Sequence, residues 1–165
     1  MTKQEKVKEI LKRLYKVYPH PKIALQFENP LQLLVATILS AQATDKVVNI
    51  VTPSLFKKYK TAQDYADAKI ADLQKIIYST GFYKSKSKYL KGIGQALVAK
   101  YGSEVPNRFE DLLTLPGVAR KTANLIMAKA FETPTGIAVD THVFRVAPRL
   151  GLTKAKNPDA MPKDL

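Results

Sequence analysis

The sequence contains no cysteine at any of its 165 positions. This absence excludes disulfide bonds, catalysis by a thiolate, zinc sites built on cysteine, and iron–sulfur clusters ligated within the chain. We therefore expect these residues to hold no metal and no cofactor.

Long apolar runs are missing as well. No stretch approaches the roughly 18 apolar residues that a membrane-spanning helix requires, and the N-terminus, MTKQEKVK, is charged. These two features predict a cytoplasmic protein without a membrane segment.

Acidic residues are scarce, with 14 Asp and Glu against 27 Lys and Arg, which gives a net charge of +13. Such an excess is typical of proteins that bind polyanions, most often nucleic acid. A solvated lysine-rich surface without such a partner would give the same count, so charge alone leaves both interpretations open.

Strand patterns are also absent, because the apolar residues keep a period near 3.6 along the whole chain. We predict an all-α protein of about ten short helices. Asn29 and Pro30 are typical of a helix start, and Gly81 and Gly102 of helix ends. For the helix that follows Gly81, the pattern predicts a solvated face of Lys84, Lys86, Lys88 and Lys91 opposite an apolar face of Tyr89, Leu90, Ile93 and Leu97.

The most informative stretch is LPGVARKTAN, from Leu115 to Asn124. Pro116 and Gly117 force a tight turn between two helices, the second of which is predicted over 119–130. A helix–hairpin–helix presents free backbone N–H groups at a helix N-terminus, which suits a phosphate. Arg120 and Lys121 follow at once, so an anion-binding turn and a primary amine lie side by side.

Four motifs occur in a defined order, namely LLVATILSAQATD (33–45), TGFYKSK (80–86), LPGVARKTAN (115–124) and AVDTHVFRV (138–146). On these motifs the chain resembles bacterial endonuclease III, a family of helix-hairpin-helix DNA glycosylases with AP-lyase activity on oxidised pyrimidines. The resemblance implies a six-helix domain over 20–134 that contains the hairpin. Residues 1–19 and 135–165 would form an incomplete second helical domain.

The resemblance also implies two catalytic residues. Lys121 matches the family's nucleophile, an amine that attacks C1′, displaces the base and leaves a Schiff base from which β-elimination cleaves the strand. Arg120, the helix dipole and partial burial would disfavour its protonated form. Asp140 matches the aspartate that stabilises positive charge at C1′ and assists proton transfer. Their plainer interpretations are a phosphate-binding lysine and the N-cap of a helix beginning at Thr141.

A damaged nucleotide must leave the duplex before this chemistry. The resemblance implies that Gln42 fills the vacated space, that Phe82 wedges the opposite strand, and that Gly117 grips a phosphate with the N–H groups of Val118 and Ala119. An ordinary loop amide and core packing are the alternatives for Gln42 and Phe82. The expected DNA-binding residues are Ser40, Gln42, Thr44, Phe82, Lys84, Gly117, Val118, Ala119, Arg120 and Thr122.

The sequence departs from the family pattern at three places. Ala119 replaces a common second glycine, which requires a negative φ there. Pro148 replaces a usual asparagine and predicts a kink in the helix behind Asp140. The four-cysteine loop of the family's 4Fe–4S cluster is missing, so we expect a C-terminally shortened chain whose apolar N-terminal helix lacks part of its cover.

The expected partner is double-stranded DNA with a damaged base or an abasic site, bound by a monomer in the nucleoid. Two other functions stay open on the sequence. One is a mismatch glycosylase acting on thymine or uracil opposite guanine, and the other is an inactive helix-hairpin-helix DNA-binding fragment.

Overall fold

The computed structural model describes residues 2–158 and 160–165. These residues form nine α-helices and two short 3-10 helices, with no strand among them, so the all-α prediction is confirmed. The chain divides into two compact units, one of residues 24–136 and one of residues 1–23 with 137–165. The sequence places the division at 20 and 134, and the assignment of these units to a six-helix domain and an incomplete second domain stays a prediction.

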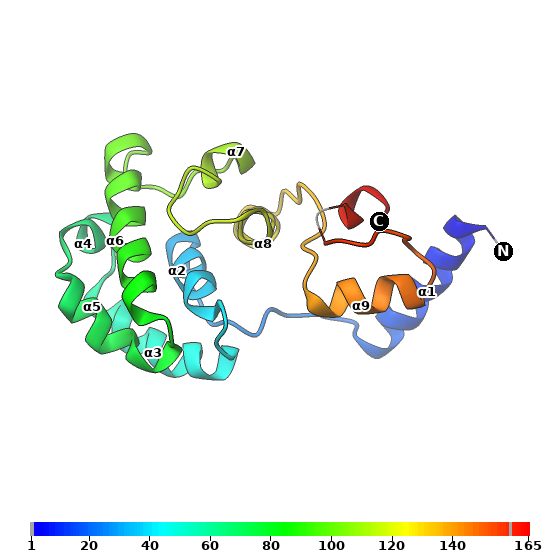
Figure 1. Cartoon of the computed structure of the whole chain (residues 1–165), viewed down its shortest axis with the longest axis horizontal. Helices are drawn as coiled ribbons and strands as arrows, with labels where there is room; N and C mark the ends of the chain where they lie inside the picture. Colours follow the sequence, from blue (N-terminus) through cyan, green and yellow to red (C-terminus); the bar gives the residue numbers. More distant parts are fainter. Residues whose placement is uncertain (1, 159) are drawn as a thin grey trace. The chain divides into compact units, whose positions relative to one another are not determined.

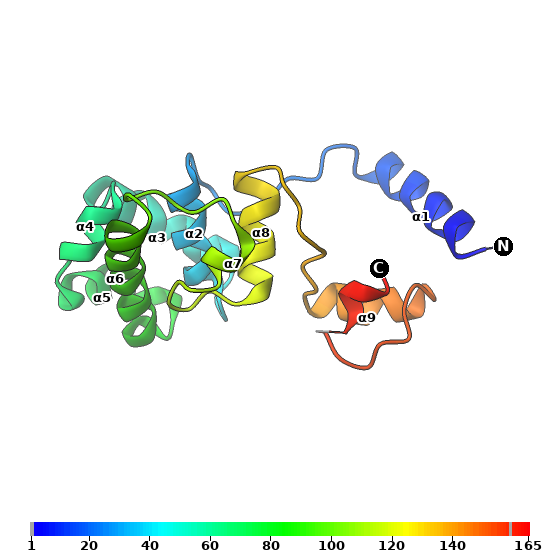
Figure 2. The ribbon, with the colours of Figure 1, turned by 90° about the horizontal axis from the view of Figure 1, so that it is seen from above.

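The larger unit is built around α2 (Pro30–Ser40), which packs against α3 (Asp45–Lys58), α6 (Tyr83–Lys100) and α8 (Arg120–Ala130). Figures 1 and 2 both show α2 between α6 and α8. Neighbours on three sides explain why this helix is apolar almost all round. Its buried residues are Leu33, Leu34, Val35, Ala36, Ile38 and Leu39.

The remaining elements of this unit are short and lie against α6 or α8. They are α4 (Ala62–Asp67), α5 (Ile70–Ile77), η1 (Tyr78–Thr80) and α7 (Phe109–Leu112). Gly94 brings α4 close to α6, because a Cβ atom there would lie 2.5 Å from the Ala66 nitrogen and 2.7 Å from the Ala62 carbonyl oxygen. Real Cβ atoms do not approach backbone so closely, so the tight packing of α4 on α6 requires glycine at this position.

Side-chain caps set several helix starts, including the start at Asn29 and Pro30 that the sequence analysis predicts. The Asn29 side chain accepts a hydrogen bond from the Gln32 N–H at 2.9 Å, and Pro30 is the first helical residue of α2. Thr44 caps α3, and Thr61 forms a reciprocal capping box with Asp64 at the start of α4. Each of these side chains satisfies a backbone donor that the helix itself leaves unpaired.

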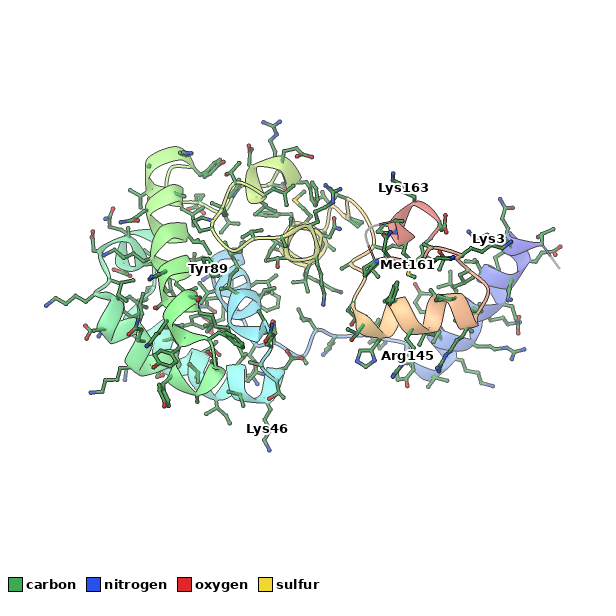
Figure 3. The ribbon with its side chains drawn as sticks, viewed as in Figure 1. Lys3, Lys46, Tyr89, Arg145, Met161 and Lys163 are labelled. Atoms are coloured by element: carbon green, nitrogen blue, oxygen red, sulfur yellow. The ribbon has the colours of Figure 1, made fainter. Side chains whose placement is uncertain are left out.

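The smaller unit contains α1 (Lys3–Val17), α9 (Thr141–Arg149) and η2 (Met161–Lys163). Met161, labelled in Figure 3, is fully buried, but the apolar faces of α1 and α9 line an open hollow of about 530 Å³. Leu11 and Leu14 on α1 are 45% and 48% exposed. The apolar faces of α1 and α9 are therefore only partly covered within the described residues, and the incomplete second domain stays a prediction.

None of the helices in the described part of the chain has both the length and the apolar character needed to cross a membrane.

Candidate active site and DNA-binding groove

The hairpin between α7 and α8 closes through its own backbone. The Val118 N–H donates to the Leu115 carbonyl at 3.1 Å, and Gly117 adopts φ +77°. A Cβ atom on Gly117 would lie 2.8 Å from ring atoms of Tyr89 on α6, a residue labelled in Figure 3. Both the left-handed backbone and the packing on Tyr89 therefore require glycine at the turn.

The N-terminus of α8 is open to an anion. Ala119 is its N-cap, with φ −95° and no side-chain cap, so the requirement for a negative φ at this alanine is met. The first hydrogen bond of the helix runs from the Ala123 N–H to the Ala119 carbonyl at 2.9 Å. Within the described residues, the N–H groups of Arg120, Lys121 and Thr122 thus have no backbone partner, and such groups bind phosphate.

One part of the expected phosphate grip is wrong. The N–H of Val118 is engaged with Leu115 inside the turn, and its side chain is buried. An N–H that already closes the hairpin is not free for a phosphate. The donors that remain near the turn belong to Gly117, Ala119 and the first turn of α8.

Lys121 lies in the first turn of α8 and is exposed, so the expected partial burial of this amine is wrong. Its neighbour Arg120 points its guanidinium carbon at the ring of Phe109 on α7, 5.0 Å from the ring centroid. This contact stabilises the approach of α7 to α8. The neighbouring Lys121 lies at the surface.

A groove of about 260 Å³ brings together four predicted residues from three of the four motifs. Gln42 follows α2, Phe82 precedes α6, Gly117 is in the hairpin and Thr122 lies on α8. The full lining consists of Thr37, Ile38, Ala41, Gln42, Phe82, Ser85, Lys86, Tyr89, Gly117 and Thr122. The fold of the larger unit thus places these four predicted DNA-binding residues on one surface.

Two residues of this groove have strained backbone. Gln42 has φ +54° and Phe82 has φ +49°, a conformation that is uncommon outside glycine and asparagine. Each costs on the order of 1–3 kcal/mol and persists only where the surroundings enforce it. Phe82 is 64% exposed, so core packing does not explain its apolar side chain.

Three other expected DNA contacts do not line the groove. The Ser40 hydroxyl donates to the Thr37 carbonyl at 2.9 Å, and the Thr44 hydroxyl accepts from the Val47 N–H at 3.3 Å as the cap of α3. Lys84 is exposed in the first turn of α6. Ser40 and Thr44 therefore shape the loop that carries Gln42, while Lys84 offers a free charge nearby.

Lys86 is the residue that the sequence pattern misplaces. It is 3% exposed, against the prediction of a solvated face, and its Nζ donates to the carbonyl oxygens of Leu39 at 2.7 Å and Thr80 at 2.8 Å. Burial lowers the pKa of this amine. Lys86 stands four residues before Leu90, on the same helical stripe as Ile93 and Leu97, and that register was a signal of its burial.

Asp140 belongs to the smaller unit, where it is the N-cap of α9. Its carboxylate accepts from the Val143 N–H at 2.8 Å, so the capping role is confirmed. Pro148 is the penultimate residue of α9, and the Leu150 N–H still reaches the Val146 carbonyl at 3.0 Å. The proline therefore removes a hydrogen bond only in the last turn, away from the end that Asp140 caps.

Comparison with known proteins identifies the family. A model of the HhH-GPD superfamily of base excision DNA repair proteins matches residues 35–165. Endonuclease III of Synechocystis sp. is 49% identical over 164 residues, which are 99% of this chain and 75% of the relative. The chain belongs to the endonuclease III family.

Solved structures of endonuclease III agree with this membership. A non-covalent endonuclease III–DNA complex is 41% identical and superposes with a TM-score of 0.92 over 99% of this chain and 76% of that one. A trapped endonuclease III–DNA covalent intermediate matches with the same identity and TM-score over 100% of this chain and 77% of that one. The chain spans about three quarters of the length of these endonuclease III proteins.

The 4Fe–4S cluster that endonuclease III proteins normally carry does not fit the residues of this chain. The sequence has no cysteine to supply thiolates. Within residues 2–158 and 160–165, no three His, Asp or Glu side chains come together in a way that could hold a metal ion. No step of the reaction considered below passes through such a cluster.

Proposed function

We propose that this chain excises oxidised pyrimidines from double-stranded DNA and then cleaves the strand at the abasic site, with Lys121 as nucleophile. Base-excision repair by a bifunctional glycosylase and AP lyase is the activity of the endonuclease III family, to which the chain belongs. The observation that carries the assignment to Lys121 is its place. An exposed lysine lies in the first turn of α8, directly after an uncapped, anion-accepting helix start.

The phosphate backbone is held first in this proposal. The hairpin and the free N–H groups at the start of α8 bind the phosphate 3′ of the lesion. The groove on the same unit then engages the duplex, with Phe82 as the wedge and Gln42 in the space that the flipped nucleotide leaves. One chain suffices for these contacts, so we propose that it binds damaged DNA as a monomer.

The chemistry begins when the neutral Lys121 amine donates its lone pair to C1′ of the flipped nucleotide. The N–C1′ bond forms as the bond from C1′ to the base breaks, and the base leaves with the electron pair and gains a proton. Opening of the sugar ring gives a protonated Schiff base. Loss of a proton from C2′ then expels the 3′ phosphate by β-elimination, because the iminium accepts the electrons.

We propose that Asp140 acts through the negative charge of its carboxylate. A carboxylate stabilises the positive charge that develops at C1′ and can accept or return a proton during these steps. The hydrogen bond from the Val143 N–H holds this carboxylate at the start of α9.

Borohydride trapping tests the proposal. Reduction of the Schiff base on duplex DNA with a single abasic site fixes the enzyme to the DNA, so the wild-type chain is expected to give a covalent adduct. Lys121→Ala should lose the adduct. Lys129→Ala, which removes an exposed lysine in the last turn of the same helix, should retain it.

The competing function, a DNA-binding fragment without catalysis, predicts a different result. Salt-sensitive binding without any wild-type adduct would support it and contradict the lyase. An adduct that survives in Lys121→Ala would show that another amine is the nucleophile.

A further inference from the structure

Lys86 ties together the two turns that carry Gln42 and Phe82. Its buried ammonium bonds to the carbonyl of Leu39, in the last turn of α2, and to the carbonyl of Thr80, the last residue of η1. Gln42 follows Leu39 by three residues, and Phe82 follows Thr80 by two. A single side chain therefore fixes two segments that lie about forty residues apart in the sequence.

These carbonyls are suitable partners for a cation. The last carbonyls of a helix lack intrahelical donors and carry its negative end. The ammonium satisfies one from each helix, and Lys86 is among the residues that line the groove. The backbone N–H of Lys86 also donates to the Phe82 carbonyl at 3.0 Å, so the residue holds the Phe82 turn from two sides.

We propose that Lys86 is a positioning residue that sets the spacing between Gln42 and Phe82, so that both side chains enter the DNA together. The proposal rests on the proposed function, because it assigns the pair to nucleotide flipping. Both residues have left-handed backbone, which relaxes when the surroundings do not enforce it. Loss of the ammonium would free the two turns to move independently.

Two substrates separate positioning from chemistry. Excision of an oxidised pyrimidine from a duplex requires flipping, whereas β-elimination at an abasic site in a single-stranded oligonucleotide does not. For Lys86→Met we expect single-turnover excision from the duplex to fall about 10- to 100-fold, as for other small misplacements. The rate on the single strand should stay within about twofold of wild type, since Lys121 is untouched.

Lys91 provides the matched control. It lies on the same helix and its Nζ also donates to a backbone carbonyl, that of Ala68 at 2.9 Å, but this carbonyl is in the connection between α4 and α5. Lys91→Met removes the same chemical group from α6 without touching the groove. We expect it to leave both rates unchanged.

The absence of cysteine allows a chemical rescue if Lys86→Met fails to fold. Lys86→Cys introduces the only thiol of the chain, which can be alkylated in denaturant before refolding. 2-Bromoethylamine restores an amine on a stem of lysine length, and 1-bromopropane places a methyl group at the same position. The amine form should recover duplex excision, and the methyl form should not.

Three results would overturn the positioning role. They are equal duplex rates for the amine and methyl forms, a parallel fall on both substrates, and refolding of the amine form alone, which would make Lys86 a residue of the fold as a whole. A wild-type chain inactive on both substrates would instead contradict the proposed function, and this proposal with it.

Discussion

Phe82 combines two features that stability alone would not maintain. Its backbone is left-handed, and its ring is 64% exposed. A bulky residue with positive φ is rare because its Cβ crowds the neighbouring carbonyl. The cost is understandable if the exposed ring works between DNA strands, where a glycine in the same turn would offer nothing to insert.

Two replacements of Phe82 should therefore differ in stability while losing the same amount of excision activity. Phe82→Gly removes the ring and relieves the backbone, while Phe82→Ala removes the ring and keeps the strain. We expect Phe82→Gly to be more stable than Phe82→Ala by about 1 kcal/mol, measured by urea unfolding. Excision from duplex DNA should fall equally in both variants.

Glu132 gives the control for this comparison. It also has a positive φ, of 54°, and lies outside the groove. Glu132→Gly and Glu132→Ala should show the same order of stability without any loss of excision. If Phe82→Gly kept wild-type excision, Phe82 would not be the wedge.

Asp140 allows its two roles to be tested separately. Asparagine caps helices about as well as aspartate, so Asp140→Asn should preserve the bond to the Val143 N–H and change the unfolding free energy by less than about 0.5 kcal/mol. Asp140→Ala should lose the cap and about 1 kcal/mol. Excision and β-elimination should fall about 100-fold in both variants, because both lack the charge.

Single-turnover rates and thermal unfolding check this expectation. If a well-folded Asp140→Asn variant kept wild-type rates, Asp140 would act only as a helix cap. Rates that fall only in Asp140→Ala would point to the same conclusion, since activity would then follow the cap rather than the carboxylate.

At the scale of elements, the caps and ends of helices were predictable because their causes are local. Asn29 with Pro30, Thr44, Thr61 and Gly81 act on backbone within a few residues of themselves. Lys86 was not placed correctly, because the carbonyls that hold it belong to α2 and η1. The pattern of charged residues along one helix does not show which carbonyl groups of another helix will pack against it.

The hairpin motif also has features that its local sequence does not predict. Its glycine turn and the helix after it follow from the sequence. Gln42, Phe82, Gly117 and Thr122 line one groove, and their contact with DNA stays a prediction. The engagement of the Val118 N–H and the exposure of Lys121 depend on how the turn closes on itself. Both features are set by the folded turn and not by the local sequence pattern.

The short helix α4 provides a pH-dependent prediction. Hydrogen bonds from the backbone N–H groups of Thr61 and Lys60 lower the pKa of Asp64 below its ordinary value of 3.8. A carboxyl whose pKa is lower in the folded state stabilises the fold above its unfolded pKa, near 4, and loses that effect as pH falls through the folded value. Asp64→Asn should therefore be less stable than wild type at pH 7 by roughly 0.3–1 kcal/mol, the effect of a negative charge in the first turn of a helix, with the difference shrinking below pH 4.

Urea unfolding at a series of pH values measures this difference. Asp67→Asn is the control, because that carboxylate bonds only to the Gln63 side chain within the described residues. Asp67→Asn should change the unfolding free energy only slightly. A deficit of Asp64→Asn that stayed constant down to pH 2 would contradict the assignment to a charged cap.

Across the whole molecule, the positive charge is largely uncompensated by ion pairs. The net charge is +13, and the described residues contain three ion pairs, all with exposed or partly exposed partners. Such pairs contribute little to stability. The exposed lysines outside these pairs are available to replace the counterions of DNA, so affinity should fall steeply as salt rises.

Two lysines of α6 distinguish the effect of a charge's position on DNA binding from the effect of the total charge. Lys84 lies in the first turn of α6, beside the groove residues Phe82 and Ser85, and Lys100 is the last residue of that helix, about 24 Å away at 1.5 Å per residue. Both are exposed. Lys84→Ala and Lys100→Ala remove the same charge, but at 0.1 M salt a distance of more than about 10 Å is screened.

We therefore expect Lys84→Ala to lower the slope of log Kd against log salt by about one, the value of one phosphate contact, and Lys100→Ala to leave it unchanged. Titrations of fluorescent duplex DNA with an abasic site at several salt concentrations measure both slopes. Equal changes in the two variants would mean that lysines act through the overall field and that the start of α6 does not face the DNA backbone. A change in Lys100→Ala alone would place the phosphate track at the opposite end of α6, away from the groove.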